Sequence, residues 1–318
     1  MSPLPAWLQT PPPTLGLHID ALRVTAVLVD RAAPSPVVRA VASAPLPPGA
    51  VVPSLTSHNV LQRDVVVRAL RELVEQVGGR PRHVALVIPD TAAKVSLLPF
   101  DQIPPSARDL EQLIRLQLRK TVPFPVEDAQ VAWSRGGQHE GSTTMVVTAM
   151  RRDIVQEYEG VCTAAGLQPG AVDLATFNVV NLALLGGTAG PGLPGDSLLV
   201  HVTASYASIA LVRDGALIFF RTRQSDATEP VADVVHQTRM FYEDRLNGQG
   251  FARVLLVAGP DVPDREGLSR NLGTLFEAPV VPLSLTGIAD VSDRVTVSET
   301  LVGQIAAPTG MLLRDGVA

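Results

Sequence analysis

Two short segments place a histidine two positions before a second polar residue. Residues 17–21 contain His18 and Asp20, and residues 200–204 contain His201 and Thr203. Brought together, imidazole and carboxylate groups could bind a transition metal, and two facing histidines could form a pH-sensitive latch. The alternative is that each imidazole only hydrogen-bonds to neighbouring backbone. The distance between the two imidazoles distinguishes these interpretations.

Both segments begin the same pattern of strand, tight turn and second strand. The apolar residues 27–29 follow the first segment as residues 210–212 follow the second, so the match extends over some thirteen positions. Matched hairpins about 180 residues apart predict two halves built on one plan. The alternative is a chance similarity between two apolar hairpins.

The segments between the hairpins alternate between helical and strand patterns. Apolar residues recur at helical spacing in residues 62–77, 154–165 and 231–242. Short β-rich runs are bounded by Gly, Pro or Asp at residues 83–88, 143–149, 197–202, 207–212, 217–221 and 253–258. A mixed α/β fold is therefore expected.

Composition narrows the classes of protein. The 318 residues suffice for two domains of ~150 residues each, and 46% of them are hydrophobic. A net charge of -5, with no basic run longer than the pair at 151–152, argues against a nucleic-acid partner. Cys162 is the only cysteine, so no internal disulfide can form, and a reducing, cytoplasmic compartment is expected. Cys162 lies on an apolar helical stripe, so it is expected to be a core residue.

The N-terminal residues lack the pattern of a signal peptide. The first 17 residues carry no Lys or Arg and contain five prolines, so residues 1–13 are expected to form a flexible arm. The longest uncharged stretch contains polar and Gly/Pro-rich residues, so no membrane span is expected.

The order of several segments resembles the PilM family of actin-like proteins of type IV pilus assembly, with FtsA and the cytoplasmic domain of GspL as more distant relatives. The segments are residues 83–89 with 97–99, the helix 110–120 running into 122–127, residues 145–149, 164–167, 172–173 and 254–259, and the closing run 306–314. This resemblance implies an actin-like, duplicated ribonuclease H-like fold. Residues 14–170 would form the first lobe, with an inserted α/β subdomain at about 83–150, and residues 171–318 the second lobe.

The resemblance also implies a nucleotide cleft, which needs an Asp in each phosphate hairpin to hold Mg²⁺ and a Gly in each turn to let backbone reach the phosphates. His18 and His201 stand where the Asp residues would be, and Asp20 and Thr203 where the Gly residues would be. Neutral imidazole is a poor Mg²⁺ ligand, and a carboxylate opposes a triphosphate. ATP and Mg²⁺ binding are therefore disfavoured.

The turn expected to line the adenosine pocket is altered as well. It reads Ala258-Gly259-Pro260, so a methyl group is added and a backbone donor is lost. The glycine-rich residues 186–192 lack the Lys-Ser/Thr of a phosphate loop, and no Gly-x-Ser-x-Gly elbow occurs. We expect no catalytic residue, no cofactor and no metal site.

The inserted subdomain carries the better binding signal. In the helix at 106–120, Leu116 lies about 120° from the main apolar face, which comprises Leu110, Leu113, Ile114 and Leu118. With Lys120, Val122 and Phe124 it is expected to line a partner groove. The alternative is that Leu116 packs on a neighbouring subdomain.

The function implied by the resemblance is that of a non-catalytic cytoplasmic scaffold in a type IV pilus inner-membrane assembly complex. Such proteins hold the N-terminal cytoplasmic peptide of the membrane protein PilN between the first and the inserted subdomain. The protein would then associate peripherally with the inner membrane through this partner, and a second copy of the chain is a further candidate partner. Alternatives are an active actin-like ATPase of pilus assembly and a cytoplasmic adaptor of a type II secretion system.

Overall fold

The computed structural model describes residues 12–32, 35–78, 82–139, 141–189, 194–225, 231–276 and 278–314. Most of the expected flexible arm, residues 1–11, lies outside the described residues, as do residues 190–192 of the glycine-rich segment.

Strands and helices follow one another along most of the chain. The strands are β1 (Leu15–Ile19), β2 (Arg23–Asp30), β3 (Val37–Pro45), β4 (His83–Ile88), β5 (Lys94–Phe100), β6 (Ala129–His139), β7 (Ser142–Arg151), β8 (Gln168–Leu174), β9 (Asp196–Val202), β10 (Tyr206–Arg213), β11 (Ala216–Gln224), β12 (Phe251–Ala258), β13 (Val280–Pro282) and β14 (Asp290–Val291). The helices are α1 (Arg63–Val77), α2 (Ala107–Leu118), α3 (Arg152–Ala164), α4 (Ala175–Leu185), α5 (Val231–Arg245), α6 (Arg265–Phe276) and α7 (Glu299–Leu313), with short 3-10 helices η2 (Asp90–Ala92) and η3 (Val126–Asp128). The elements expected from the sequence all occur, with small shifts at their ends.

Two of the three sheets have the same construction. The first sheet runs β14-β3-β2-β1-β4-β8 and the second β11-β10-β9-β12-β13. Apart from β14, which pairs parallel with β3 at one edge of the first sheet, each sheet has three antiparallel strands followed by two parallel ones, so β1 corresponds to β9 and β4 to β12. The two halves therefore repeat one ribonuclease H-like plan, which confirms the interpretation of the matched hairpins.

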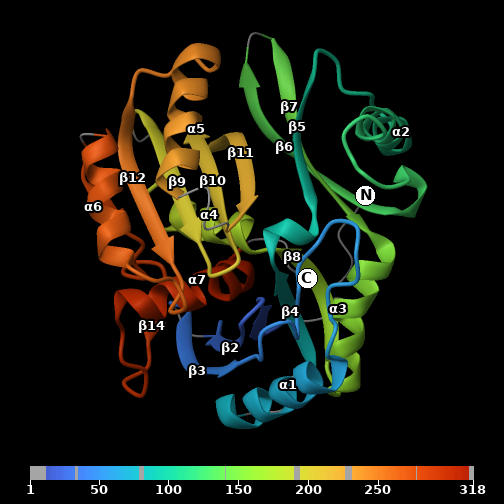
Figure 1. The fold of residues 1–318 in the computed structure, drawn as a ribbon, viewed down its shortest axis with the longest axis vertical. Coiled ribbons are helices and arrows are strands. Elements are labelled where there is room, and N and C mark those ends of the chain that lie inside the picture. Colours follow the sequence, from blue (N-terminus) through green and yellow to red (C-terminus); the bar gives the residue numbers. More distant parts are fainter. Residues whose placement is uncertain are drawn as a thin grey trace.

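Helices separate and cover the two sheets. Helices α1 and α3 pack on the outer face of the first sheet, and α5 and α6 on the outer face of the second. Between the sheets lie α4 and α7, which share one apolar core with strands of both. Figure 1 shows the first lobe at the bottom, the second lobe on the left, and β5–β7 with α2 at the upper right.

The local sequence explains where the helices begin and end. Helix α1 buries Val66, Leu70 and Leu73 on one side, and it ends at Gly78, whose φ of 74° suits glycine. Helix α2 begins after Ser106, whose hydroxyl accepts a hydrogen bond from Asp109 N and so caps the helix.

Both expected domain boundaries need correction. Residues 83–88 form β4, which pairs with β1 inside the first sheet, so the separate three-stranded sheet of the inserted subdomain begins at Lys94. The expected start of the second lobe, residue 171, falls within β8, which is the edge strand of the first sheet.

Some expected core positions are exposed and others are buried as expected. Leu113 of α2 is 41% exposed and Phe241 of α5 is 42% exposed, although both lie on expected apolar faces. Leu110, Ile114 and Leu118 are buried at spacings of four residues, because a three-stranded sheet covers only a narrow stripe of α2. Cys162 is fully buried, as predicted.

Candidate functional site: a closed cleft and an open groove

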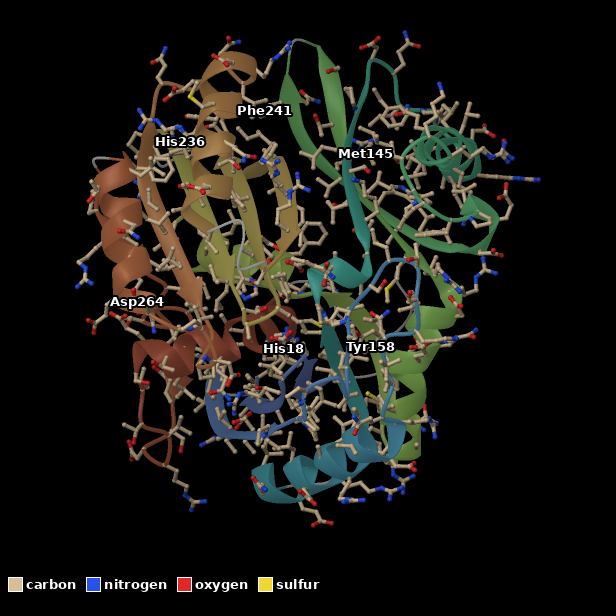
Figure 2. The ribbon with its side chains drawn as sticks, viewed as in Figure 1. His18, Met145, Tyr158, His236, Phe241 and Asp264 are labelled. Atoms are coloured by element: carbon tan, nitrogen blue, oxygen red, sulfur yellow. The ribbon has the colours of Figure 1, made fainter. Side chains whose placement is uncertain are left out.

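The two hairpins meet at the centre of the molecule with matching geometry. His18 lies opposite Thr25 in the first hairpin, and His201 lies opposite Ser208 in the second. Each turn closes with an equivalent backbone hydrogen bond, from Asp20 N to Arg23 O at 2.8 Å and from Thr203 N to Tyr206 O at 2.9 Å. Figure 2 shows His18 near the middle of the molecule, where the two lobes meet. The four residues singled out in the sequence do line one cavity.

The two imidazoles are buried and neutral. Burial lowers the pKa of His18 to about 4 and that of His201 to about 3, with the neighbouring His18 contributing to the second shift. His201 Nδ1 lies 2.7 Å from Thr176 Oγ1, a side chain rather than neighbouring backbone. His18 Nε2 is buried without a hydrogen-bond partner. In the part of the chain that the structure describes, no three His, Cys, Asp or Glu residues gather to hold a metal.

A buried aspartate that the sequence did not single out anchors this region. Asp90 follows β4, is fully buried, and accepts hydrogen bonds from Thr176 N at 3.0 Å, from the Thr176 hydroxyl and from Ser208 Oγ at 2.6 Å. Thr176 belongs to the first turn of α4, whose positive end favours a carboxylate. Burial nevertheless raises the pKa of Asp90 to about 6.

These contacts form a continuous chain between the lobes. With Asp90 ionised, Thr176 and Ser208 donate to it, so their oxygens accept from His201 Nδ1 and from Thr222 Oγ1, the latter at 2.8 Å. His201 lines the central cavity, whereas Thr222 lines a larger cavity further out. The chain therefore connects the two cavities through polar side chains.

The central cavity is too small for a nucleotide. Its volume is about 30 Å³, room for about one water molecule, whereas small-molecule sites usually measure ~300–1,000 Å³. Arg23 crosses it and binds Asp261 through two hydrogen bonds of 2.8 Å. Ser205 Oγ also reaches Asp20 Oδ1 at 3.4 Å. The protein's own side chains thus fill the cleft.

Asp20 adds an unfavourable charge to this cleft. Burial raises the pKa of its carboxyl to about 6, although a hydrogen bond from Ala21 N opposes the shift. Above that pH it is mostly ionised and repels a polyphosphate.

The altered adenosine turn packs tightly against the C-terminal helix. Ala258 is fully buried, and Gly259 N donates to Val202 O at 3.2 Å, which ties the turn to β9. Gly303 of α7 lies so close to Ala258 that a Cβ at residue 303 would be 2.1 Å from Ala258 O. Gly259 also lines the small cavity between the hairpins.

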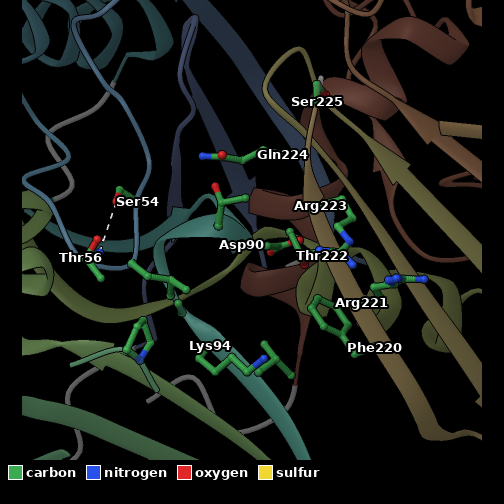
Figure 3. A pocket seen from close by; sticks show the side chains of 15 residues that line it. Ser54, Thr56, Asp90, Lys94, Phe220, Arg221, Thr222, Arg223, Gln224 and Ser225 are labelled. Atoms are coloured by element: carbon green, nitrogen blue, oxygen red, sulfur yellow. Dashed lines mark hydrogen bonds between the residues drawn. The ribbon is translucent and has the colours of Figure 1, made fainter. Parts of the chain in front are cut away.

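The open space lies elsewhere, beside the inserted subdomain. A cavity of about 950 Å³ is bounded by residues 54–56 of the first lobe, Lys94 and Pro123 of the inserted subdomain, and residues 220–225 of the second lobe. Figure 3 shows Ser54 and Thr56 across this space from β11, with Asp90 between them. A second cavity of about 600 Å³ is bounded by Pro123, Phe124 and residues 151–153. Thr56 and Pro123 line both cavities, so the two cavities are adjacent, and together they are named here the subdomain groove.

The residues expected to bind a partner are not brought together in this groove. Phe124 lines its smaller end, and Val122 is half-buried against the core of the inserted subdomain. Leu116 is 57% exposed and Lys120 is exposed, and neither is among the described residues that line the groove. Leu116 does not pack on a neighbouring subdomain either, since more than half of its surface is exposed. Helix α2 turns its apolar stripe inward and leaves Leu116 on the far side.

Two ribonuclease H-like halves around a central cleft, with a subdomain inserted after β4, define the actin-like ATPase fold. Residues 16–244 match the family model of the type IV pilus assembly protein PilM. Because this match covers more than half of the chain, the protein belongs to the PilM family, as the sequence resemblance predicted.

Solved structures agree on the fold. The PilM-PilN type IV pilus biogenesis complex contains a chain with a TM-score of 0.79 and 18% identity, over 96% of this chain and 98% of that one. An actin-like ATPase-fold protein of Bacteroides thetaiotaomicron gives a TM-score of 0.56 at 8% identity, over 96% and 99% of the two chains. The cytoplasmic domain of EpsL, from the type II secretion system of Vibrio cholerae, gives a TM-score of 0.50 at 12% identity, over 94% of each of the two chains. Within the described residues, no helix has the length and apolar character needed to span a membrane.

Proposed function

We propose that the protein is a non-catalytic cytoplasmic scaffold of a type IV pilus inner-membrane assembly complex. In this proposal it binds the N-terminal cytoplasmic peptide of a PilN-like membrane protein and is held peripherally at the inner membrane by that partner. Membership of the PilM family and the likeness to the PilM chain of a PilM-PilN complex support the choice of partner.

The observation that carries the proposal is where the open space lies. The cleft between the hairpins holds about 30 Å³, while the subdomain groove offers cavities of about 950 Å³ and 600 Å³. Catalysis on a nucleotide needs room and cation ligands in the cleft, but the cleft is too small, and His18 and His201 stand where the family resemblance places the carboxylate ligands. A peptide instead needs an elongated groove with polar and apolar walls.

The walls of the groove suit an extended peptide. Its first wall, residues 54–56, is a loop with exposed Thr56, and its opposite wall is β11, which ends the second sheet. Phe220 and Pro123 add apolar surface, and Lys94 adds a positive charge. A peptide can lie between the loop and the strand with its side chains directed to either wall.

Blocking the groove tests the proposal. Thr56→Trp places a large ring at a position that lines both cavities, and it should weaken binding of a synthetic N-terminal peptide of the PilN-like partner by about tenfold or more in isothermal titration. Thr274→Trp, at an exposed position of α6 on the far lobe, is the matched control and should bind as the wild type does. Equal affinity of both variants would place the peptide elsewhere.

A further inference from the structure

We propose that the ion pair between Arg23 and Asp261 is a strut that holds the two lobes together across the closed cleft and thereby sets the width of the subdomain groove. This inference rests on the proposed function, because it treats the groove as the site of the partner peptide. The strut is supplied by the chain itself, so the lobe arrangement that accepts the peptide would not depend on a nucleotide.

The ion pair has the geometry of a firm contact. Arg23 is the first residue of β2, and Asp261 follows β12, 238 residues later. Arg23 Nε donates to Asp261 Oδ2 and Arg23 Nη2 to Asp261 Oδ1, both at 2.8 Å, in the two-pronged arrangement that is strongest for such pairs. Arg23 Nη1 also donates to Ser43 Oγ at 3.3 Å, which fixes the arginine to β3. The side chains are only 23% and 30% exposed.

Two other contacts beside the ion pair are longer, and neither joins two charged groups. Ser205 Oγ to Asp20 Oδ1 and Gln304 Nε2 to Thr25 Oγ1 are both 3.4 Å. Among the ion pairs of the described ranges, the pair of Arg23 with Asp261 is the one that spans this cleft. Its loss should therefore loosen the cleft more than the loss of either of these two longer contacts.

The cleft and the groove share the elements that the strut joins. The walls of the groove come from the first lobe, through residues 54–56, and from the second lobe, through residues 220–225. A rotation between the lobes changes the distance between these walls. Gln224 Nε2 donates to Pro53 O at 3.4 Å, so the walls already touch at one point.

The polar chain through Asp90 is suited to act as the pivot. Asp90 comes from the first lobe and accepts from Ser208 of the second, while Thr176 beside it contacts His201 of the second. This chain lies between the cleft, which His201 lines, and the groove, which Thr222 lines. If the lobes separate at the ion pair, they would rotate about these central contacts, and the distance between the walls of the groove would change.

The test measures the distance between the lobes and the peptide affinity separately. Spin labels at Glu72→Cys of α1 and Thr274→Cys of α6, both exposed, report on the two lobes, while the native Cys162 is buried. In Arg23→Ala the distance distribution should broaden, and the PilN-like peptide should bind about tenfold more weakly. The double variant Arg23→Asp with Asp261→Arg should restore both.

Two further comparisons keep the outcomes distinct. Arg23→Lys keeps the charge but lacks the two-pronged contact, so it should give an intermediate result even if Arg23→Ala folds poorly. An unchanged distance distribution in Arg23→Ala and Arg23→Lys would overturn the strut, and a changed distribution with unchanged affinity would overturn its control of the groove. Failure of the proposed function would appear separately, as peptide binding that Thr56→Trp does not weaken.

Discussion

Asp90 shows how one side chain joins the two lobes without a positive partner. Its carboxylate rests on neutral donors from Thr176 and Ser208, and burial raises its pKa to about 6. The charge of Asp173 nearby raises the pKa further. Because the folded state binds this proton more tightly than the unfolded chain, the contribution of Asp90 to stability is greatest at low pH and is lost as pH rises through 6.

Asp90→Asn should therefore change how stability depends on pH. Between pH 4 and pH 8 the difference in unfolding free energy between variant and wild type should move in favour of the variant by up to about 3 kcal/mol, the value of a pKa shift from 3.8 to about 6. Urea denaturation at several pH values measures it, with the exposed Asp101→Asn as matched control. A constant difference across this range would contradict the buried, titrating carboxyl.

Sequence reasoning found the hairpin residues but not their partners. His18 and His201 were recognisable because the pattern around each is repeated in the chain. Asp90 follows an ordinary apolar strand, and its contacts reach residues 86 and 118 positions away, so no local spacing marks it. The contact of Arg23 with Asp261 is hidden for the same reason, since only the folded sheets bring β2 beside the end of β12.

At the scale of elements, α7 is the helix on which both lobes pack most closely. A Cβ at Gly303 would lie 2.1 Å from Ala258 O, and one at Gly310 would lie 2.0 Å from Asn178 O. The helix therefore meets β12 on one side and α4 on another at backbone distance. The closing run 306–314, which carries part of the family resemblance, lies in this helix, and its close packing explains why Gly310 is required.

Gly310→Ala should destabilise the protein by about 2 kcal/mol or more, because an added methyl must displace the backbone of α4. Gly160→Ala on α3 is the matched control, since a Cβ there meets only the end of Arg63 at 3.8 Å. Its higher helix propensity should stabilise the protein by up to about 1 kcal/mol. Thermal unfolding of the two variants compares them, and a similar loss in both would refute the close packing of α7.

Helix α2 shows where periodicity alone is insufficient. The sequence predicted the helix and its start, and Leu110 and Ile114 are buried as expected. Leu113 and Leu116 remain exposed because the inserted sheet is narrow, and a sequence does not state how wide the covering surface is. Of the residues expected to line the partner groove, Phe124 borders the open space, whereas Leu116 and Lys120 lie away from it.

At the scale of the whole molecule, the closed cleft between the two lobes is expected to prevent nucleotide binding. We expect isothermal titration with Mg-ATP to give no micromolar binding, because Arg23 and Asp261 occupy the space between the hairpins and Asp20 repels phosphate. The PilN-like peptide in the same preparation is the positive control. Micromolar binding of Mg-ATP would show that the cleft opens and would favour the active ATPase.

The parallel pairing of β14 with β3 determines when the first lobe can be completed during synthesis of the chain. A ribosome that has released residues up to 185 has produced the first lobe with one sheet edge uncovered and with α4 lacking α7. The sheet edge is covered when residues 290–291 have been made, and α4 gains its partner helix when residues 299–313 have been made. The first lobe is thus completed last, and a premature stop near the C-terminus would damage the half of the protein that was synthesised first.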